Sequence, residues 1–209
     1  MTANALLDRY LSECPLIAIL RGVTPDEVEA IGDVIFDAGI RIIEVPFNSP
    51  KPIESITRLA AKFGDRALVG GGTVLKPEQV AEVTAAGGRL VVSPNTNVEV
   101  IVETVAAGLV SCPGYFTPSD AFDALEAGAT ALKLFPAEGA SPAVLKAHRA
   151  VLPKDLTMIV VGGIHPGNMQ PWVDAGANGF GLGSALYRAG QSIAETAEKA
   201  RAFVDGWRG

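Results

Sequence analysis

Residues 16–27 read LIAILRGVTPDE, which is an apolar run of strand length followed by the start of a helix. Thr24 stands at the N-cap position, Pro25 at the first helical position and Glu27 at the capping-box position. The same order, a short apolar strand and then a helix, recurs along the chain. Strands separated by helices predict parallel pairing with right-handed crossovers.

We expect one helix over residues 3–12 and then eight strand–helix units. Ala-Gly pairs before several strands are typical of helices that end in a left-handed cap. The strands are expected at 16–20, 42–46, 67–70, 90–92, 109–112, 131–135, 157–161 and 179–182. The helices are expected at 24–39, 51–63, 76–86, 97–106, 118–127, 141–151, 168–175 and 192–207.

The expected fold is an α/β protein, a (β/α)8 TIM barrel with an extra N-terminal helix, in one domain over residues 1–209. A doubly wound open sheet is the rival fold. The turn after the first strand contains only Gly22, so it lacks the glycine fingerprint of that rival. In a barrel, active groups are expected at the carboxyl ends of the strands.

Composition limits the classes of function. The 209 residues are 48% hydrophobic and 19% charged with a net charge of -6, which favours one substantial core and argues against a nucleic-acid surface. There is no signal peptide and no apolar run that could span a bilayer, so we expect a cytoplasmic protein without a membrane partner. Cys14 and Cys112 are expected to be reduced thiols, and His148 and His165 form no ligand-like cluster, so no metal is expected.

A lysine interrupts the sixth apolar run, ALKLFPA at residues 131–137. Strand alternation places Lys133 on the same side as Phe135 and opposite Leu132 and Leu134. A desolvated lysine loses its proton more easily, and a neutral amine condenses with a carbonyl to give a Schiff base. The alternative is a structural lysine that reaches water or pairs with a carboxylate.

Glu44 lies within the second strand, and alternation points it away from Ile43 and Val45. If those two apolar residues face the helices, Glu44 points into the barrel. There it can pair with Lys133 or transfer protons as a general acid and base. A structural ion pair with an inward basic residue is the alternative.

Arg21 and Thr73 end the first and third strands. The guanidinium fork of Arg21 suits a carboxylate or a phosphate, although a surface arginine that bonds the next helix is the alternative. Thr73 follows three glycines, which allow the backbone to approach a small ligand or simply form a flexible turn.

Glycine-rich segments follow the last two strands. Gly162 and Gly163 follow the seventh strand, and Gly183 and Ser184 follow the eighth, where we expect a short helix to begin. Backbone amides at these two positions form the phosphate pocket of many barrels, which predicts an anion site.

Five segments together resemble the class I KDPG/KHG aldolase family: IAILRG at 17–22, EVPFNSP at 44–50, GGTVL at 71–75, ALKLFP at 131–136 and VGGI at 161–164. The resemblance runs from about residue 15 to the C-terminal helix. It implies a pyruvate-dependent aldolase with Lys133 as Schiff-base lysine and Glu44 as acid and base. It also implies a homotrimer and a reaction without a metal or other cofactor.

Two positions resemble the 2-dehydro-3-deoxy-6-phosphogalactonate aldolase branch of that family. Asn48 stands where the gluconate branch has an arginine, and Val161 stands where it has a threonine. A valine cannot donate a hydrogen bond to the C4 hydroxyl of the substrate. The implied substrate is therefore a phosphorylated 2-keto-3-deoxy sugar acid of galactonate configuration, cleaved to pyruvate and D-glyceraldehyde 3-phosphate.

In this prediction Arg21 and Thr73 hold the carboxylate end of the substrate, and Gly162, Gly163, Gly183 and Ser184 hold its phosphate. Three alternatives stay open. They are an aldolase for the gluconate epimer or 4-hydroxy-2-oxoglutarate, a phosphate-binding barrel isomerase or epimerase, and a sugar-phosphate sensor without turnover.

Overall fold

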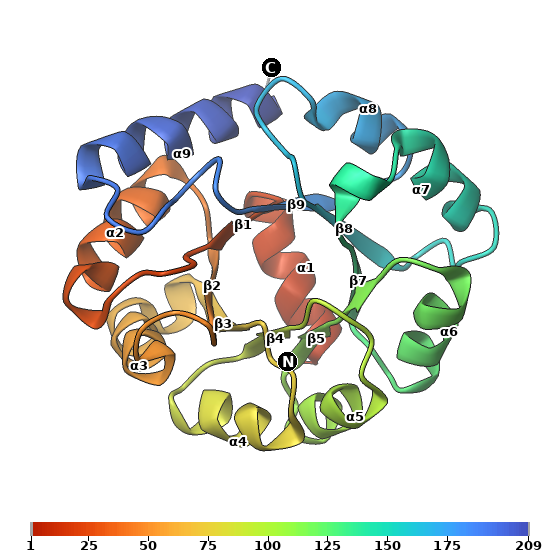
Figure 1. Ribbon diagram of the computed structural model, residues 1–209, viewed down its shortest axis with the longest axis horizontal. Helices are drawn as coiled ribbons and strands as arrows, with labels where there is room; N and C mark the ends of the chain where they lie inside the picture. Colours follow the sequence, from red (N-terminus) through yellow and green to blue (C-terminus); the bar gives the residue numbers. More distant parts are fainter. Residues whose placement is uncertain (1, 209) are drawn as a thin grey trace.

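A ring of parallel strands is enclosed by a ring of helices in the computed structural model, which describes residues 2–208 (Figure 1). All strand pairs are parallel. The strands are β1 (Leu16–Ile19), β2 (Ile42–Pro46), β3 (Leu68–Gly72), β4 (Leu90–Val92), β5 (Val110–Cys112), β6 (Gly114–Tyr115), β7 (Ala131–Leu134), β8 (Thr157–Val161) and β9 (Gly179–Leu182).

The helices alternate with the strands, as the repeated pattern predicts. Proline opens α2, α3, α4, α6 and α7, where its missing N–H costs no helical hydrogen bond. The helices are α1 (Ala3–Glu13), α2 (Pro25–Ala38), α3 (Pro52–Phe63), α4 (Pro77–Ala85), α5 (Val98–Ala106), α6 (Pro118–Glu126), α7 (Pro142–Arg149), α8 (Met169–Asp174) and α9 (Ile193–Arg208), with short 3-10 turns η1 (Gly64–Arg66) and η2 (Ala137–Gly139).

The barrel prediction is confirmed, with one correction to the strand count. The fifth of the eight expected strands is two short strands, β5 and β6, separated by Pro113, which has no N–H to donate to a strand ladder. Segment 110–115 still closes the ring. β5 pairs with β4, and β6 pairs with β7, while the Lys133 amide donates to the Pro113 carbonyl at 2.9 Å.

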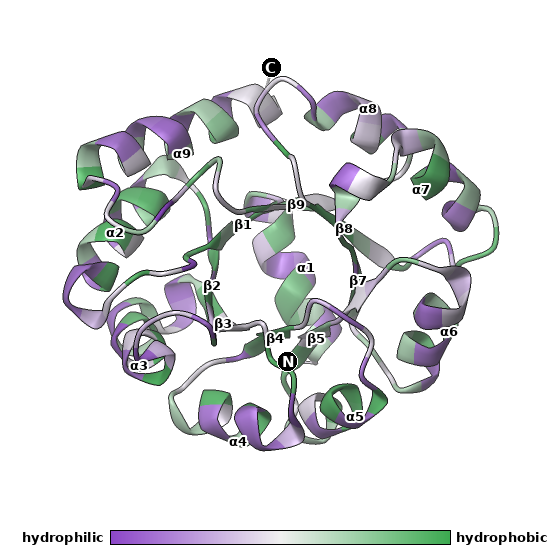
Figure 2. Cartoon of the chain, viewed as in Figure 1, coloured by the Kyte–Doolittle hydropathy of each residue, from purple (hydrophilic) through white to green (hydrophobic). Residues whose placement is uncertain are grey.

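Two hydrophobic layers hold the barrel together. Side chains on the outer faces of the strands, such as Ile43, Val45, Leu132 and Leu134, pack against the helices in the larger cluster. The inner cluster includes Ile42 and Ala131 from the opposite faces of the same strands. Figure 2 shows hydrophobic strands surrounded by helices that carry both hydrophobic and hydrophilic residues. Lys133 and Glu44 therefore face inward, as strand alternation predicts.

Helix α1 closes the amino-terminal end of the barrel and crosses the middle of the ring in Figure 1. Leu7 and Tyr10 are buried in the inner cluster, and the Tyr10 hydroxyl donates to the Asp65 carbonyl at 2.8 Å. Immediately after α1, the Pro15 carbonyl accepts a hydrogen bond from the Phe180 amide at 2.9 Å. With this end plugged, only the carboxyl ends of the strands are left to admit a ligand.

One local prediction is wrong. The short helix expected near Ser184 is a single hydrogen-bonded turn, in which the Leu186 and Tyr187 amides donate to the Gly183 carbonyl at 2.9 and 3.0 Å. The other element boundaries agree with the predicted ones within about two residues. Among residues 2–208, no helix has both the length and the apolar composition needed to cross a membrane.

Candidate active site

Lys133 lies in the middle of β7 with its ammonium inside the barrel. The residue is 5% exposed, and Nζ lies 4.6 Å from the centre of the Phe135 ring. Burial lowers the pKa of Lys133, and the nearby Glu44 carboxylate opposes part of that shift. The amine of this lysine is thus more readily deprotonated than that of a surface lysine.

Glu44 reaches the same interior from β2 and is 1% exposed. Burial raises the pKa of its carboxyl to about 7, although Lys133 and then Arg21 pull it downward. Oε2 of Glu44 is buried and has no hydrogen-bond partner within the described part of the chain. A carboxyl group with a pKa near neutrality exchanges protons in both directions, which suits a general acid and base.

Gly72 at the end of β3 makes the space for this carboxylate. A side chain on Gly72 would overlap both oxygens of Glu44. The sequence predicted that the glycines at 70–72 let the backbone approach a ligand. In the structure, Gly72 instead leaves room for the side chain of Glu44. Gly72 determines where the acid lies, and no local signal in the sequence links the two residues.

A cavity of about 670 Å³ opens at the carboxyl ends of the strands. Phe135 lies in its wall, so the cavity extends to the aromatic ring that contacts Lys133. Six of the nine predicted site residues also line it: Arg21, Val161, Gly162, Gly163, Gly183 and Ser184. The structure thus brings Arg21, Val161 and the predicted phosphate loops together in one cavity, whereas Lys133, Glu44 and Thr73 are not among the residues that line it.

Arg21 and Thr73 occupy different surroundings. The Arg21 guanidinium lies in the cavity wall, where Nη1 donates to Oδ1 of Asn48 at 2.8 Å. Thr73 is half-buried with a φ of 53° and lies outside that wall. The structure therefore supports a ligand contact for Arg21 more directly than for Thr73.

Four polar or charged side chains that the sequence reasoning did not assign to the site also line the cavity, namely Glu138, His165, Tyr187 and Arg188. The Glu138 carboxylate lies against the backbone of Gly162, which has a φ of 118°. Glu138 follows β7 by a few residues and Arg188 follows Ser184 by four, so proximity to strand ends was the available signal.

Cys112 forms part of the inner wall and is 2% exposed. Burial raises the pKa of its thiol to about 12, which disfavours the thiolate that a cysteine nucleophile needs. Within residues 2–208, no group of three or more His, Cys, Asp or Glu residues is arranged to hold a metal ion.

Comparison with known proteins identifies the family. The family model described as KDPG and KHG aldolase matches residues 7–201, so the chain belongs to this family. This confirms the resemblance of the five sequence segments.

Two curated relatives have more specific names. The chain is 50% identical over 200 residues to 2-dehydro-3-deoxy-6-phosphogalactonate aldolase of Escherichia coli (strain K12), covering 96% of this chain and 98% of that protein. It is 43% identical over 192 residues to a probable 2-dehydro-3-deoxy-6-phosphogalactonate aldolase of Rhizobium meliloti (strain 1021), covering 92% and 91%. A solved structure described as native KDPGal matches with a TM-score of 0.92 at 51% identity, covering 94% of this chain and 95% of that one.

Proposed function

We propose that this chain is a class I aldolase that cleaves 2-dehydro-3-deoxy-6-phospho-D-galactonate to pyruvate and D-glyceraldehyde 3-phosphate. The observation that carries the proposal is that Lys133 and Glu44 are both buried inside the barrel, with Lys133 against Phe135, a residue of the cavity wall. The names of the two curated relatives point to the same reaction.

The proposed reaction begins at Lys133. Its neutral amine attacks the C2 carbonyl of the substrate and forms a carbinolamine. Protonated Glu44 donates its proton to the departing hydroxyl, which leaves as water and gives the iminium. Because burial favours both the neutral amine and the neutral acid, the two groups can start this step near neutral pH.

The iminium then serves as the electron sink for bond cleavage. Glu44, now a carboxylate, removes the proton of the C4 hydroxyl directly or through a water molecule. The C3–C4 bond breaks, the aldehyde leaves, and the bonding electrons form a pyruvate enamine on Lys133. Protonation of the enamine at C3 and hydrolysis release pyruvate. Lys133 supplies the electron sink, so the proposed reaction needs no metal or organic cofactor.

The substrate is proposed to lie with its carboxylate toward Arg21 and Thr73 and its phosphate toward Gly162, Gly163, Gly183 and Ser184. Val161, which is 6% exposed, lines the same cavity as Arg21 and the four predicted phosphate contacts. It offers the C4 hydroxyl no hydrogen bond.

The hydrogen bond between Asn48 and Arg21 is a second observation that supports the galactonate assignment. The amide oxygen of Asn48 binds the Arg21 guanidinium at 2.8 Å, where the gluconate branch would place a second arginine. The runner-up is an aldolase for the gluconate epimer or 4-hydroxy-2-oxoglutarate. Equal kcat/KM values for the two C4 epimers would overturn the galactonate assignment and leave the aldolase chemistry intact.

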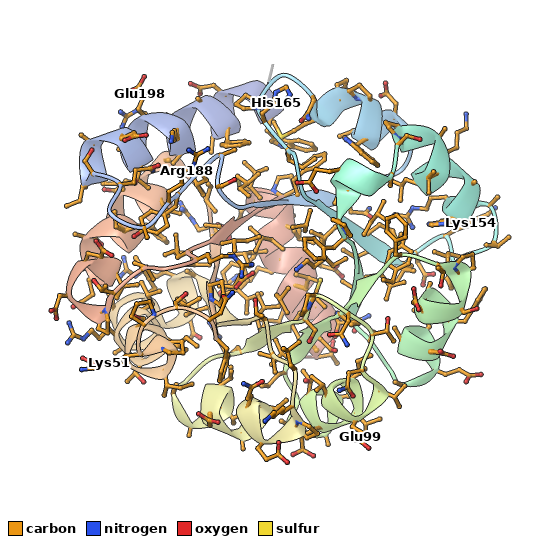
Figure 3. All side chains as sticks on the ribbon, in the orientation of Figure 1. Lys51, Glu99, Lys154, His165, Arg188 and Glu198 are labelled. Atoms are coloured by element: carbon orange, nitrogen blue, oxygen red, sulfur yellow. The ribbon has the colours of Figure 1, made fainter. Side chains whose placement is uncertain are left out.

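Borohydride reduction in the presence of pyruvate tests the chemistry. We expect a stable pyruvate-sized adduct on Lys133 by intact mass and peptide mapping, absent from Lys133→Ala. Lys154→Ala is the matched control, because this exposed lysine lies far from the cavity (Figure 3). No adduct in folded wild-type protein would favour a phosphate-binding barrel isomerase and contradict the proposal.

We also propose that the chain forms a homotrimer in the cytoplasm and that residues 1–209 are one domain. An apolar outer face supports the assembly. Val98, Val102 and Val105 are 49%, 51% and 42% exposed along one face of α5, which Figure 2 shows largely in the hydrophobic colour. Phe122 on neighbouring α6 is 46% exposed. Contiguous apolar surface of this kind marks a protein contact.

A further inference from the structure

Arg188 is a cavity residue that the proposed chemistry leaves without a role. It lies on the segment that follows β9 and lines the cavity together with Gly162, Gly163 and Ser184. Arg188 and His165 both lie on the side of the barrel that α9 covers (Figure 3). The guanidinium of Arg188 contacts Ser184, so it lies beside one of the two loops predicted to bind phosphate.

Buried hydrogen bonds hold the segment that carries Arg188. The hydroxyl of Tyr187, which is 2% exposed, donates to Oε1 of Glu27 at 3.1 Å. Nε2 of Gln191 donates to the Leu186 carbonyl at 2.7 Å and to the Thr196 hydroxyl at 2.9 Å. The backbone on both sides of Arg188 is thus fixed before a ligand enters, which reduces the entropy lost on binding.

The Arg188 guanidinium is held by one hydrogen bond, which leaves its other N–H groups for a ligand. Its Nε donates to the Ser184 carbonyl at 3.0 Å. In the part of the chain that the structure describes, neither Nη has a hydrogen-bond partner, and no carboxylate forms an ion pair with the guanidinium within 4.0 Å. Arg21, by contrast, has its Nη1 bound to Asn48. The free N–H groups of Arg188 can accommodate an incoming oxyanion.

Glu138 brings a negative charge to one of the predicted phosphate loops. The Glu138 carboxylate lies against Gly162, which belongs to one of the loops predicted to bind phosphate. A negative charge at this place repels an incoming phosphate. The chain as a whole carries a net charge of -6, which adds to the repulsion. Backbone amides alone would have to overcome both effects.

We propose that Arg188 binds the phosphate end of the substrate and makes the enzyme select phosphorylated over unphosphorylated 2-keto-3-deoxy sugar acids. This inference rests on the proposed function, because it concerns the same cavity. The guanidinium adds a positive charge to the cavity that Glu138 also lines, and it adds charge-assisted hydrogen bonds to those of the glycine-rich loops. Amide donors alone would discriminate less strongly, because they bring no net charge.

The test compares two substrates, phosphorylated 2-keto-3-deoxygalactonate and its unphosphorylated analogue. For Arg188→Gln, the ratio of the two kcat/KM values is expected to fall about 10- to 100-fold, the effect of losing hydrogen bonds to a charged group. Arg188→Lys should restore part of the ratio, since it restores the charge but not the fork. Arg201→Gln is the matched control, because Arg201 is exposed on α9 outside the cavity.

Calorimetric binding of inorganic phosphate separates this inference from the proposed function. Wild type should bind phosphate, and Arg188→Gln should bind it about 10-fold or more weakly. An unchanged substrate ratio together with unchanged phosphate affinity overturns the role of Arg188. Failure of wild type to form the pyruvate adduct overturns the aldolase proposal, while the phosphate measurement still decides whether Arg188 binds the anion.

Discussion

Burial in the barrel, and not their mutual attraction, favours the neutral forms of Lys133 and Glu44. Burial raises the pKa of Glu44 to about 7 and lowers the pKa of Lys133. Each charge favours the charged form of the other, but desolvation is the larger effect for both residues. Near neutral pH, an acid that can give up its proton therefore lies in the same interior as an amine that can attack.

Glu44→Gln is expected to lower the pKa of Lys133 further. The substitution removes the carboxylate that raises that pKa, so the ammonium loses its proton at a lower pH. NMR titration of protein labelled with 13C-lysine measures the shift, with the Lys133 signal assigned by its absence in Lys133→Ala. Glu99→Gln, on exposed α5, is the control (Figure 3). A Lys133 midpoint that stays in place or rises would contradict the electrostatic coupling.

Gly72→Ala is expected to displace the Glu44 carboxylate and to lower kcat/KM about 100-fold or more, because misplacement of an acid by about 1 Å is costly. The added methyl should also destabilise the fold by about 1–3 kcal/mol through overpacking. Steady-state kinetics and urea unfolding measure the two effects. Gly167→Ala is the control, since its methyl would have only ordinary contacts. Wild-type kinetics in Gly72→Ala would show that the carboxylate tolerates another position.

At the scale of elements, each strand–helix unit is built from local signals, while α1 depends on the finished barrel. Thr24 and Glu27 cap α2 within four residues of each other, and Gly39 ends it with a φ of 115°. Helix α1 instead contributes Leu7 and Tyr10 to a core made by strands from the whole chain. Its stabilising contacts are therefore long-range.

Leu7→Ala is expected to lower the free energy of unfolding by about 2–4 kcal/mol, since it leaves a cavity under the barrel. Urea denaturation measures the change, and Asp8→Ala, on the exposed side of α1, should leave stability within about 0.5 kcal/mol of wild type. Equal stabilities for the two variants would mean that α1 does not pack as a plug in solution.

At the scale of the whole molecule, the outer face of α5 and α6 carries exposed apolar side chains. Val98, Val102 and Val105 on α5 lie beside α6, and a side chain on Gly128 after α6 would lie 3.4 Å from Val105. Burying this surface against other copies of the chain would remove it from water, which favours association.

Val102→Glu is expected to convert the proposed trimer into monomers, because the carboxylate would be buried without a partner at the contact. Light scattering after size-exclusion chromatography measures the mass. Val151→Glu is the control, since Val151 is 59% exposed and lies after α7, away from α5. A Val102→Glu protein that remains a trimer would place the interface on another face.

The sequence by itself determined the order of strands and helices and the inward direction of Lys133 and Glu44. Capping residues, glycines and strand alternation act over a few residues, so their structural effects can be predicted from the sequence. Strand ends and glycine-rich segments then predicted five of the residues that line the cavity, and the family resemblance added Val161.

Only the tertiary structure decided which distant groups meet. Gly72 makes room for Glu44, Asn48 binds Arg21 across 27 residues, and Glu138 and Arg188 share one cavity although about 50 residues separate them. The tertiary structure also showed that Pro113 divides the fifth expected strand while the ring of strands stays closed. Such contacts depend on barrel closure and on loops whose paths no local spacing specifies, because closure brings together strand ends from every part of the chain.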